Sequence, residues 1–213
     1  MISNLLQPIR SYVRSRKFTK KFLRNVWGDL ESRSGEGSNR ASGSVRHSLR
    51  VLSEITERYG VTSVADIPCG DVNWIGIYLE ANPRVGYVGY DIVRRLIAAN
   101  RERFPARKFE LLDIVVQVPA SAELVFCKDL FNHLERHEIF GAIANMRRSG
   151  STWLLASNNF GHDYVALGKG PHKDSRHIDL TMPPFRFPAP IWNDHYLGLW
   201  KLPEMEPRDR NNR

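Results

Sequence analysis

The chain has 213 residues, of which 42% are hydrophobic, and it carries a formal net charge of +8. This length suits one domain with an ordinary core, and no run approaches 18 apolar residues, so no transmembrane helix is expected. Two dispersed cysteines, Cys69 and Cys127, exclude a disulfide framework and a zinc site.

The positive charge is concentrated at the start of the chain. Residues 1–28 contain seven Lys or Arg and no acid, which leaves a net charge of about +1 for the remainder. Apolar residues recur among them at roughly helical spacing, as in an amphipathic surface helix: Ile9, Val13, Phe18, Phe22, Val26 and Trp27. Such a helix either packs Phe22 and Trp27 on the domain, or contacts anionic lipid, or binds nucleic acid. Since no apolar signal peptide precedes it, a cytoplasmic location is expected, with peripheral membrane contact as an option.

Residues 31–40 are small and polar, which is typical of a loop. One interpretation is a linker. The other is a flap, in which Gly35 and Gly37 bring backbone donors to a ligand carboxylate and Arg40 supplies the counter-charge. We therefore divide the chain into an arm with a loop over residues 1–44, a folded domain over 45–202 and a flexible tail over 203–213.

A periodic apolar pattern over residues 45–59 predicts a helix, and residues 61–67 predict the first strand. The turn that follows contains Asp66, Pro68, Cys69, Gly70 and Asp71. In an open parallel sheet the ligand binds beyond the carboxyl ends of the strands, and a glycine there lets the backbone approach it. A short helix over residues 73–79, which includes Trp74, is expected to point its positive N-terminus at the ligand.

Two further predicted strands also end in acids. Residues 86–90 precede Asp91, and residues 109–112 precede Asp113. Asp91 either binds ribose hydroxyls or caps the next predicted helix, over residues 93–103. Asp113 either accepts a hydrogen bond from an adenine amino group or caps a turn.

The runs Asp-Ile-Pro-Cys-Gly-Asp, Val-Gly-Tyr-Asp-Ile and Leu-Leu-Asp-Ile resemble the glycine loop and the two adenosine-binding acids of class I methyltransferases that use S-adenosylmethionine. The resemblance covers Val45 to Ser157, and it departs from the family because Pro68-Cys69-Gly70 replaces the usual Gly-x-Gly. It implies an α/β Rossmann-like sandwich whose sheet has seven strands, mostly parallel with an antiparallel last strand, and helices on both faces. It also implies S-adenosyl-L-methionine as cofactor. The implied cofactor-binding residues are Gly35, Arg40, Asp66, Pro68, Cys69, Gly70, Asp71, Trp74, Asp91, Ile92, Asp113, Ile114, Lys128 and Asp129.

A fourth predicted strand, over residues 123–127, leads into Lys128-Asp129-Leu-Phe-Asn-His133. If residues 129–134 form a helical turn, Asp129 and His133 lie four apart on one face. The carboxylate can then fix the imidazole tautomer, and His133 can act as a general base. The alternative is a structural histidine bound to a backbone carbonyl.

The remaining segments are expected to form the acceptor side. A helix over 136–148 and a strand over 151–157 lead to Asn158 and Asn159, and a polar loop over 161–175 contains His162. The proline-rich run 182–190 is expected to line the pocket with Phe185 and Phe187 as an extended edge. Residues 196–202 predict the last strand, antiparallel as the resemblance implies. The predicted acceptor-binding residues are Asn158, Asn159, His162 and Phe185, and no metal is predicted.

The sequence predicts a methyltransferase acting on an oxygen or nitrogen of a small molecule, for example a sugar or glycan precursor. The alternatives are an RNA methyltransferase that uses the basic arm and a non-catalytic binding protein of the same fold. A nicotinamide dehydrogenase would need a third glycine that the loop lacks, and no DNA partner is expected. Asp129 and Asp163 are too few carboxylates for a metal-assisted enzyme, and the sequence leaves the oligomeric state open.

Overall fold

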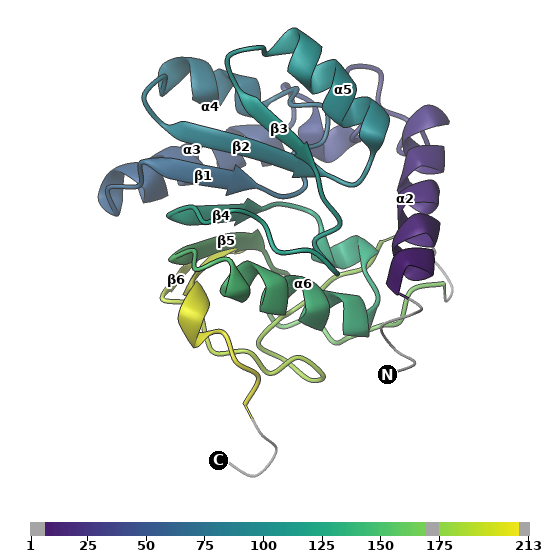
Figure 1. Ribbon diagram of the computed structural model, residues 1–213. Coiled ribbons are helices and arrows are strands. Elements are labelled where there is room, and N and C mark those ends of the chain that lie inside the picture. Colours follow the sequence, from purple (N-terminus) through teal and green to yellow (C-terminus); the bar gives the residue numbers. More distant parts are fainter. Residues whose placement is uncertain (1–6, 169–174, 209–213) are drawn as a thin grey trace. The chain divides into compact units, whose positions relative to one another are not determined.

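The computed structural model describes residues 7–168 and 175–208 and divides the chain into two compact units, Met1–Asp113 and Ile114–Arg213. Figure 1 labels most of their elements. The first unit contains α2 (Gln7–Leu23), η1 (Glu36–Ser38), α3 (Gly43–Arg58), β1 (Ser63–Asp66), α4 (Ile75–Ala81), β2 (Gly86–Asp91), α5 (Arg94–Arg103) and β3 (Lys108–Leu111). The second contains β4 (Leu124–Cys127), η2 (Phe131–His133), α6 (Arg136–Arg148), β5 (Trp153–Ser157), β6 (Trp192–Asn193), β7 (Leu197–Lys201) and η3 (Leu202–Glu204).

The strands form the predicted mostly parallel sheet. In the first unit β1 pairs with β2 and β2 with β3, both parallel, with Asp66 opposite Gly89 and Asp91 opposite Leu111. In the second, β4 and β5 are parallel, whereas β7 is antiparallel to both β5 and β6. The seven strands have the order β3-β2-β1-β4-β5-β7-β6, which confirms the predicted fold class. The two-residue β6 is too short for an alternating pattern to predict it.

Burial follows from the apolar runs. All four residues of β4 are buried, as expected of a parallel strand covered on both sides. Helix α6 buries Ile139, Ile143 and Met146 and begins with a capping box between Glu135 and Glu138, which satisfies two free backbone N–H groups. Helix α5 packs against β2 and β3. Within the described residues, no helix is both long enough and apolar enough to span a bilayer.

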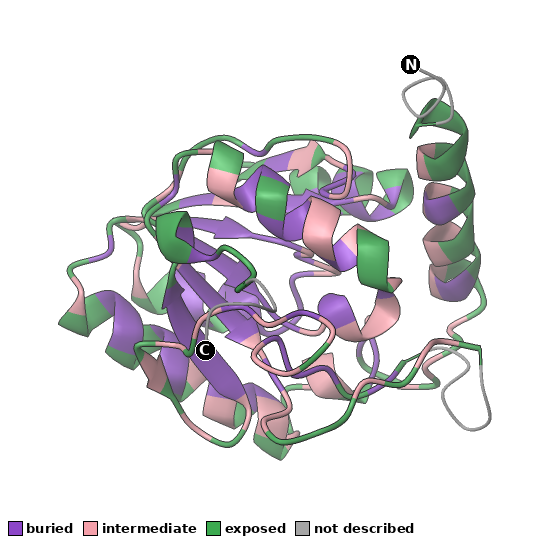
Figure 2. Ribbon diagram, turned by 90° about the horizontal axis from the view of Figure 1, so that it is seen from below, coloured by how far each residue is buried: buried purple, intermediate pink, exposed green. Residues whose placement is uncertain are grey.

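The arm forms the predicted helix, and the two residues predicted to pack on the domain are half-buried: the centre of the Phe22 ring lies 5.6 Å from the guanidinium carbon of Arg33, and Trp27 packs against Gly35. In α2 the buried side chains are Arg14 and Lys21, each 7% exposed, and Figure 2 shows the remaining surface of the helix as exposed or intermediate. Ile9 and Val13 are 59% exposed, and Val26 and Trp27 follow the end of the helix. Arg14 points inward because its guanidinium pairs with the buried carboxylate of Asp113.

Two other predictions need correction. The predicted flexible tail is in part packed, since Met205 is 1% exposed and Arg147 forms an ion pair with Glu206 at 2.5 Å. Residues 209–213 of that tail, residues 1–6 of the arm and residues 169–174 of the polar loop lie outside the described residues. Phe185 belongs to the core: it is 1% exposed and its ring packs against Phe140 and Tyr164.

Candidate functional site

The loop after β1 folds back onto the end of β2. The backbone N–H of Cys69 donates to the carbonyl of Tyr90 at 2.8 Å, and that of Gly70 donates to Asp91 Oδ2 at 3.2 Å. Gly70 has φ +55°, a left-handed conformation that favours glycine. From α5, Asn100 Nδ2 donates to the Gly70 carbonyl at 2.7 Å. The loop is thus fixed at the carboxyl ends of neighbouring parallel strands, where a ligand is expected.

Asp91 is a buried acid whose carboxylate is bonded to the loop and to the backbone that follows β2. Its Oδ1 accepts from the backbone N–H of Val93 at 2.8 Å, and its side chain is 7% exposed. Burial raises its pKa to about 6, although the N–H groups of Val93 and Gly70 partly offset this. The N-cap of α5 is Val93, so Asp91 does not cap that helix. Each carboxylate oxygen has a further lone pair with which it can accept a ribose hydroxyl.

Asp66, the last residue of β1, is buried and bonded to β2. Its Oδ2 accepts from the Tyr87 hydroxyl at 2.7 Å, and it is 3% exposed. Burial raises the pKa of the Cys69 thiol, and the charges of Asp91 and Asp66 raise it further. Both acids therefore lie close to Cys69, and Asp66 acts as a structural acceptor for the Tyr87 hydroxyl.

Asp113 lies two residues beyond β3 and already has a cationic partner. Arg14 Nε lies 3.1 Å from both carboxylate oxygens, and Arg14 Nη2 lies 2.9 Å from Oδ2. The two side chains are 7% and 4% exposed. One residue further along α2, Ser15 Oγ donates to the carbonyl of Ile92 at 3.1 Å. Helix α2 thus lies over the part of the edge that the sequence predicted to bind adenosine.

The segment predicted as a flap lies on the glycine loop. Asp71 accepts from Ser32 Oγ at 2.9 Å, from the backbone N–H of Arg33 at 3.0 Å and from Ser34 Oγ at 3.2 Å. A Cβ on Gly70 would lie only 2.5 Å from Ser34 Oγ. The segment is therefore a well-bonded cover and not a linker.

Its predicted ligand-binding groups are engaged within the protein. The Gly35 N–H donates to the carbonyl of Ser32 at 3.1 Å, and Arg40 Nε donates to the carbonyl of Asn73 at 2.9 Å. Helix α4 begins at Ile75, two residues later than predicted, and the preceding Trp74 is 7% exposed. The predicted contact of the N-terminus of α4 with a ligand stays a prediction.

In the second unit, Asp129 follows β4 with φ +56°. Its carboxylate accepts from the Tyr196 hydroxyl and from Lys128 Nζ, both at 2.5 Å, and its N–H donates to Ser157 Oγ at 2.8 Å. The Lys128 side chain is 6% exposed, so this cation is buried beside the Asp129 carboxylate. Ile114, at the start of this unit, is 5% exposed and its carbonyl accepts from Asn145 Nδ2 at 2.6 Å.

The predicted pair of Asp129 and His133 does not form. The helical segment there is η2, a 3-10 turn that begins at Phe131, because the left-handed backbone of Asp129 directs its side chain elsewhere. Among the described residues, Asp129 makes no hydrogen bond or ion pair with His133. The role of His133 as a base stays a prediction.

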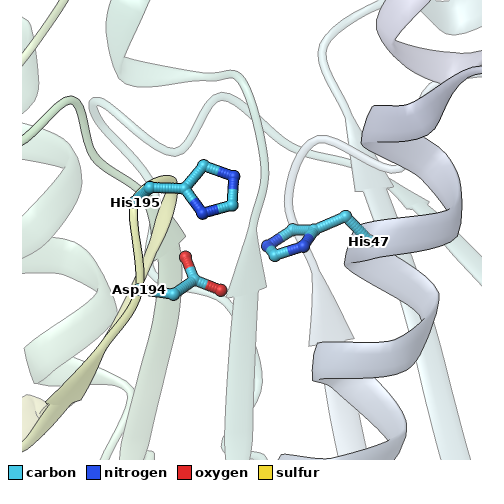
Figure 3. Close-up of side chains that lie close together, drawn as sticks. All are labelled: His47, Asp194 and His195. Carbon is cyan, nitrogen blue, oxygen red and sulfur yellow. The ribbon is translucent and has the colours of Figure 1, made fainter.

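Asp194 fixes the turn that presents Tyr196. Figure 3 labels Asp194 and His195 in the segment between β6 and β7, and His47, which belongs to α3 of the first unit. Asp194 Oδ1 accepts from the backbone N–H groups of Tyr196 and Leu197, both at 2.8 Å. This turn therefore sets the position of the Tyr196 side chain, whose hydroxyl reaches Asp129.

A polar cavity of about 400 Å³ adjoins Asp129 and the end of β5. Its lining residues are Asp129, Asn132, Ser157, Asn159, Ser175, Arg176, His177, Ile178 and Tyr196. Of the predicted acceptor residues, only Asn159 is in this wall. His162 is exposed and is not in the lining, but its Nδ1 lies 3.1 Å from Nδ1 of the lining residue His177. Asn158 is 1% exposed and bonds to Asp179 and to the backbone of Leu180, so its role is structural.

The sequence did not single out Arg176, His177 and Tyr196. Arg176 and His177 come directly after the polar loop that was expected to line the pocket, and Tyr196 begins the predicted last strand. The only available signal was an arginine in a run that alternates polar and apolar residues, Arg176-His-Ile-Asp-Leu180.

No family model matches this chain, and no curated protein matches it. Solved structures with a similar fold include magnesium protoporphyrin IX methyltransferase from Synechocystis PCC 6803 with bound SAH, 16% identical over 72% of each chain with a TM-score of 0.49. The methyltransferase domain of bacterial CtHen1 is 13% identical over 62% of this chain and 77% of that chain, with a TM-score of 0.49. The amino pentose methyltransferase CalS10 from Micromonospora echinaspora is 20% identical over 55% and 51%, with a TM-score of 0.46. Identities this low assign neither activity nor ligand to this chain.

Proposed function

We propose that this chain binds S-adenosylmethionine and transfers its methyl group to an oxygen or nitrogen of a small molecule. The observation that carries the proposal is the hydrogen bond between the Gly70 N–H and Asp91. It joins the glycine loop after β1 to the acid that ends β2, at the edge where nucleotide-type ligands bind in open parallel sheets. Asp91 would accept from the ribose hydroxyls, and the backbone around Gly70 would approach the cofactor.

Methyl transfer from a sulfonium needs little covalent help, because the cofactor supplies the activated methyl group. The chain's own residues have to hold the acceptor, exclude water and remove a proton where the acceptor requires it. In this proposal the cavity beside Asp129 holds the acceptor. Two residues are candidates for receiving the proton. Asp129 lies in the wall of this cavity, whereas His133 does not.

Calorimetry with purified full-length protein tests the proposal. S-adenosylmethionine and S-adenosylhomocysteine are each expected to bind at one site, and NADH, titrated as the control for a dehydrogenase, is expected to give no heat. If NADH binds and the two sulfur nucleosides do not, the assignment fails.

A non-catalytic binding protein is the second candidate, and the Arg14–Asp113 ion pair favours it. If Arg14 holds Asp113 permanently, an adenine amino group cannot use that acid. In that case the two sulfur nucleosides give no heat of binding with the wild-type chain, whereas Arg14→Gln, which frees the Asp113 carboxylate, is expected to bind them.

The partner of the basic arm is also a proposal. Exposed apolar side chains, Ile9, Tyr12 and Val13, share the outer surface of α2 with exposed basic side chains, including Arg16 and Lys20. That mixture fits an anionic membrane surface, where basic groups meet headgroups and apolar groups insert. An RNA partner would use the same charges without the apolar residues. The expected cytoplasmic location stays a prediction.

A further inference from the structure

Arg176 is a buried cation in the wall of the second unit's cavity. Its side chain is 3% exposed, and its Nη2 donates to the carbonyl of Leu134. Its Nε and Nη1 are buried and have no hydrogen-bond partner among residues 7–168 and 175–208. The guanidinium carbon lies 5.1 Å from the centre of the Tyr164 ring. Burial lowers the pKa of Arg176, and buried donors without partners are rare in native proteins.

A second lining residue has the same property. Asn132 Oδ1 is buried without a partner in the described part of the chain, and the Asn132 carbonyl accepts from the backbone N–H of Arg176 at 3.2 Å. Two adjacent residues of one cavity therefore have polar atoms that the protein does not satisfy. Such groups point to a ligand, since leaving them unpaired costs free energy in the unliganded protein.

The charges around the cavity favour an anion at Arg176. Asp129 is the acid in the lining, and its carboxylate is already paired with Lys128 and bonded to Tyr196. Glu135 and Glu138 act on Arg176 only through space and raise its pKa, while their own carboxylates are used in the capping box of α6. No described acid forms an ion pair with Arg176, so its charge is uncompensated at close range.

We propose that the methyl acceptor is a small anionic molecule whose oxyanion, most simply a carboxylate, binds Arg176 in this cavity. Its other polar group would meet Asn132 or Asp129, and a volume of about 400 Å³ is suited to a small molecule. Only the identification of this anion as the methyl acceptor rests on the proposed function, because binding of the anion itself requires no cofactor. It narrows the expected acceptor from a sugar or glycan precursor in general to a compound that carries an acidic group.

Binding of matched probes tests the inference. 4-Hydroxybenzoate, 4-hydroxybenzamide and inorganic phosphate are titrated into the full chain without cofactor and followed by ligand-observed NMR. The benzoate is expected to bind about tenfold or more tightly than the neutral amide, the range for losing a charged hydrogen bond. If phosphate binds and the benzoate does not, the site still binds an oxyanion, and the acceptor carries a phosphate group in place of a carboxylate. Equal binding of the benzoate and the amide overturns the inference.

Variants connect the binding to Arg176. Arg176→Met is expected to lose the preference for the anion, Arg176→Lys to keep part of it, and Arg136→Gln to leave it unchanged, because Arg136 is exposed on α6 of the same unit. A merely structural arginine would lower the unfolding temperature without changing the preference. If Arg176→Met does not fold, Arg176→Lys and the probe comparison decide. A folded Arg176→Met variant that keeps the wild-type preference for the benzoate over the amide contradicts the inference. Failure of S-adenosylmethionine to bind while the anion binds would refute only the proposed function.

Discussion

The strand ends of the two units differ in how their charged groups are satisfied. In the first unit the acids have protein partners: Asp113 binds Arg14, and Asp71 accepts from the segment 32–34. In the second, Arg176 has buried N–H groups without a partner among the described residues. The difference suggests that the first unit is held in a closed arrangement by its own arm, whereas the second presents a preformed polar site.

Removing Arg14 should have the largest effect on stability. Arg14→Gln leaves the buried Asp113 carboxylate without its cation, and breaking a buried pair in this way costs about 3–5 kcal/mol of unfolding free energy. Chemical denaturation measures it. Asp113→Asn in the Arg14→Gln background should recover part of the loss, since no buried charge then remains. A loss below about 1 kcal/mol would show that the first unit is not held by this pair.

The pH dependence of stability should report Asp91. Its pKa is about 6 in the folded protein against an ordinary value of 3.8, so the folded state binds the proton more tightly. The stabilisation is present below about pH 4 and is lost as the pH rises through 6, by about 3 kcal/mol. Asp91→Asn should remove this component. The unfolding free energy of the variant should therefore rise relative to that of the wild type between pH 4 and pH 7. Parallel stability curves for the two proteins would contradict the assigned pKa.

The same substitution should weaken the cofactor. Asp91→Asn loses a charged acceptor for the ribose and should lower the affinity for S-adenosylhomocysteine by about 1–3 kcal/mol. Wild-type affinity should also fall below about pH 6, where Asp91 takes up its proton. Calorimetry at pH 5 and pH 8 measures both effects. An affinity that neither change alters would remove Asp91 from the site.

The close contact between the glycine loop and its cover can be tested next. Gly70→Ala puts a Cβ 2.5 Å from Ser34 Oγ at φ +55°, which should cost about 1–2 kcal/mol for the backbone conformation alone. Ser34→Ala should relieve the part that comes from the steric clash and leave the backbone part. Equal stability of Gly70→Ala and wild type would show that the cover does not rest on the loop.

The smallest effect concerns the exposed surface of α2. The double variant Ile9→Ser and Val13→Ser should leave stability unchanged, because both residues are 59% exposed. It should weaken co-sedimentation with phosphatidylserine vesicles about fivefold to tenfold, as apolar groups no longer insert. Val118→Ser, also exposed at 43%, serves as the matched control. Retention of full vesicle binding by the double variant would argue against lipid contact.

The sequence predicted the fold better than the site. Apolar runs and terminal acids located β1 to β5 and β7 within about two residues, because burial in a parallel sheet leaves a strong local pattern. The contacts of Arg14 with Asp113 and of Tyr196 with Asp129 join residues 99 and 67 positions apart. No periodicity encodes such pairs.

The errors have physical causes. Helical spacing identified α2 and the packing of Phe22, but not the inward-facing Arg14, because its partner Asp113 lies 99 positions away in the sequence. The Asp129–His133 pair assumed a helical backbone, and a single residue at φ +56° was enough to break it. Prolines around Phe185 indicated an extended edge, yet the Phe185 ring is buried against Phe140 and Tyr164.

A crystal structure of the full chain with S-adenosylhomocysteine tests the central claim most directly. We expect the ribose hydroxyls within hydrogen-bond distance of Asp91, the Gly70 backbone beside the ligand and Asp113 released from Arg14 toward the adenine. Ligand bound away from Asp91, with the Arg14 pair intact, would contradict the account.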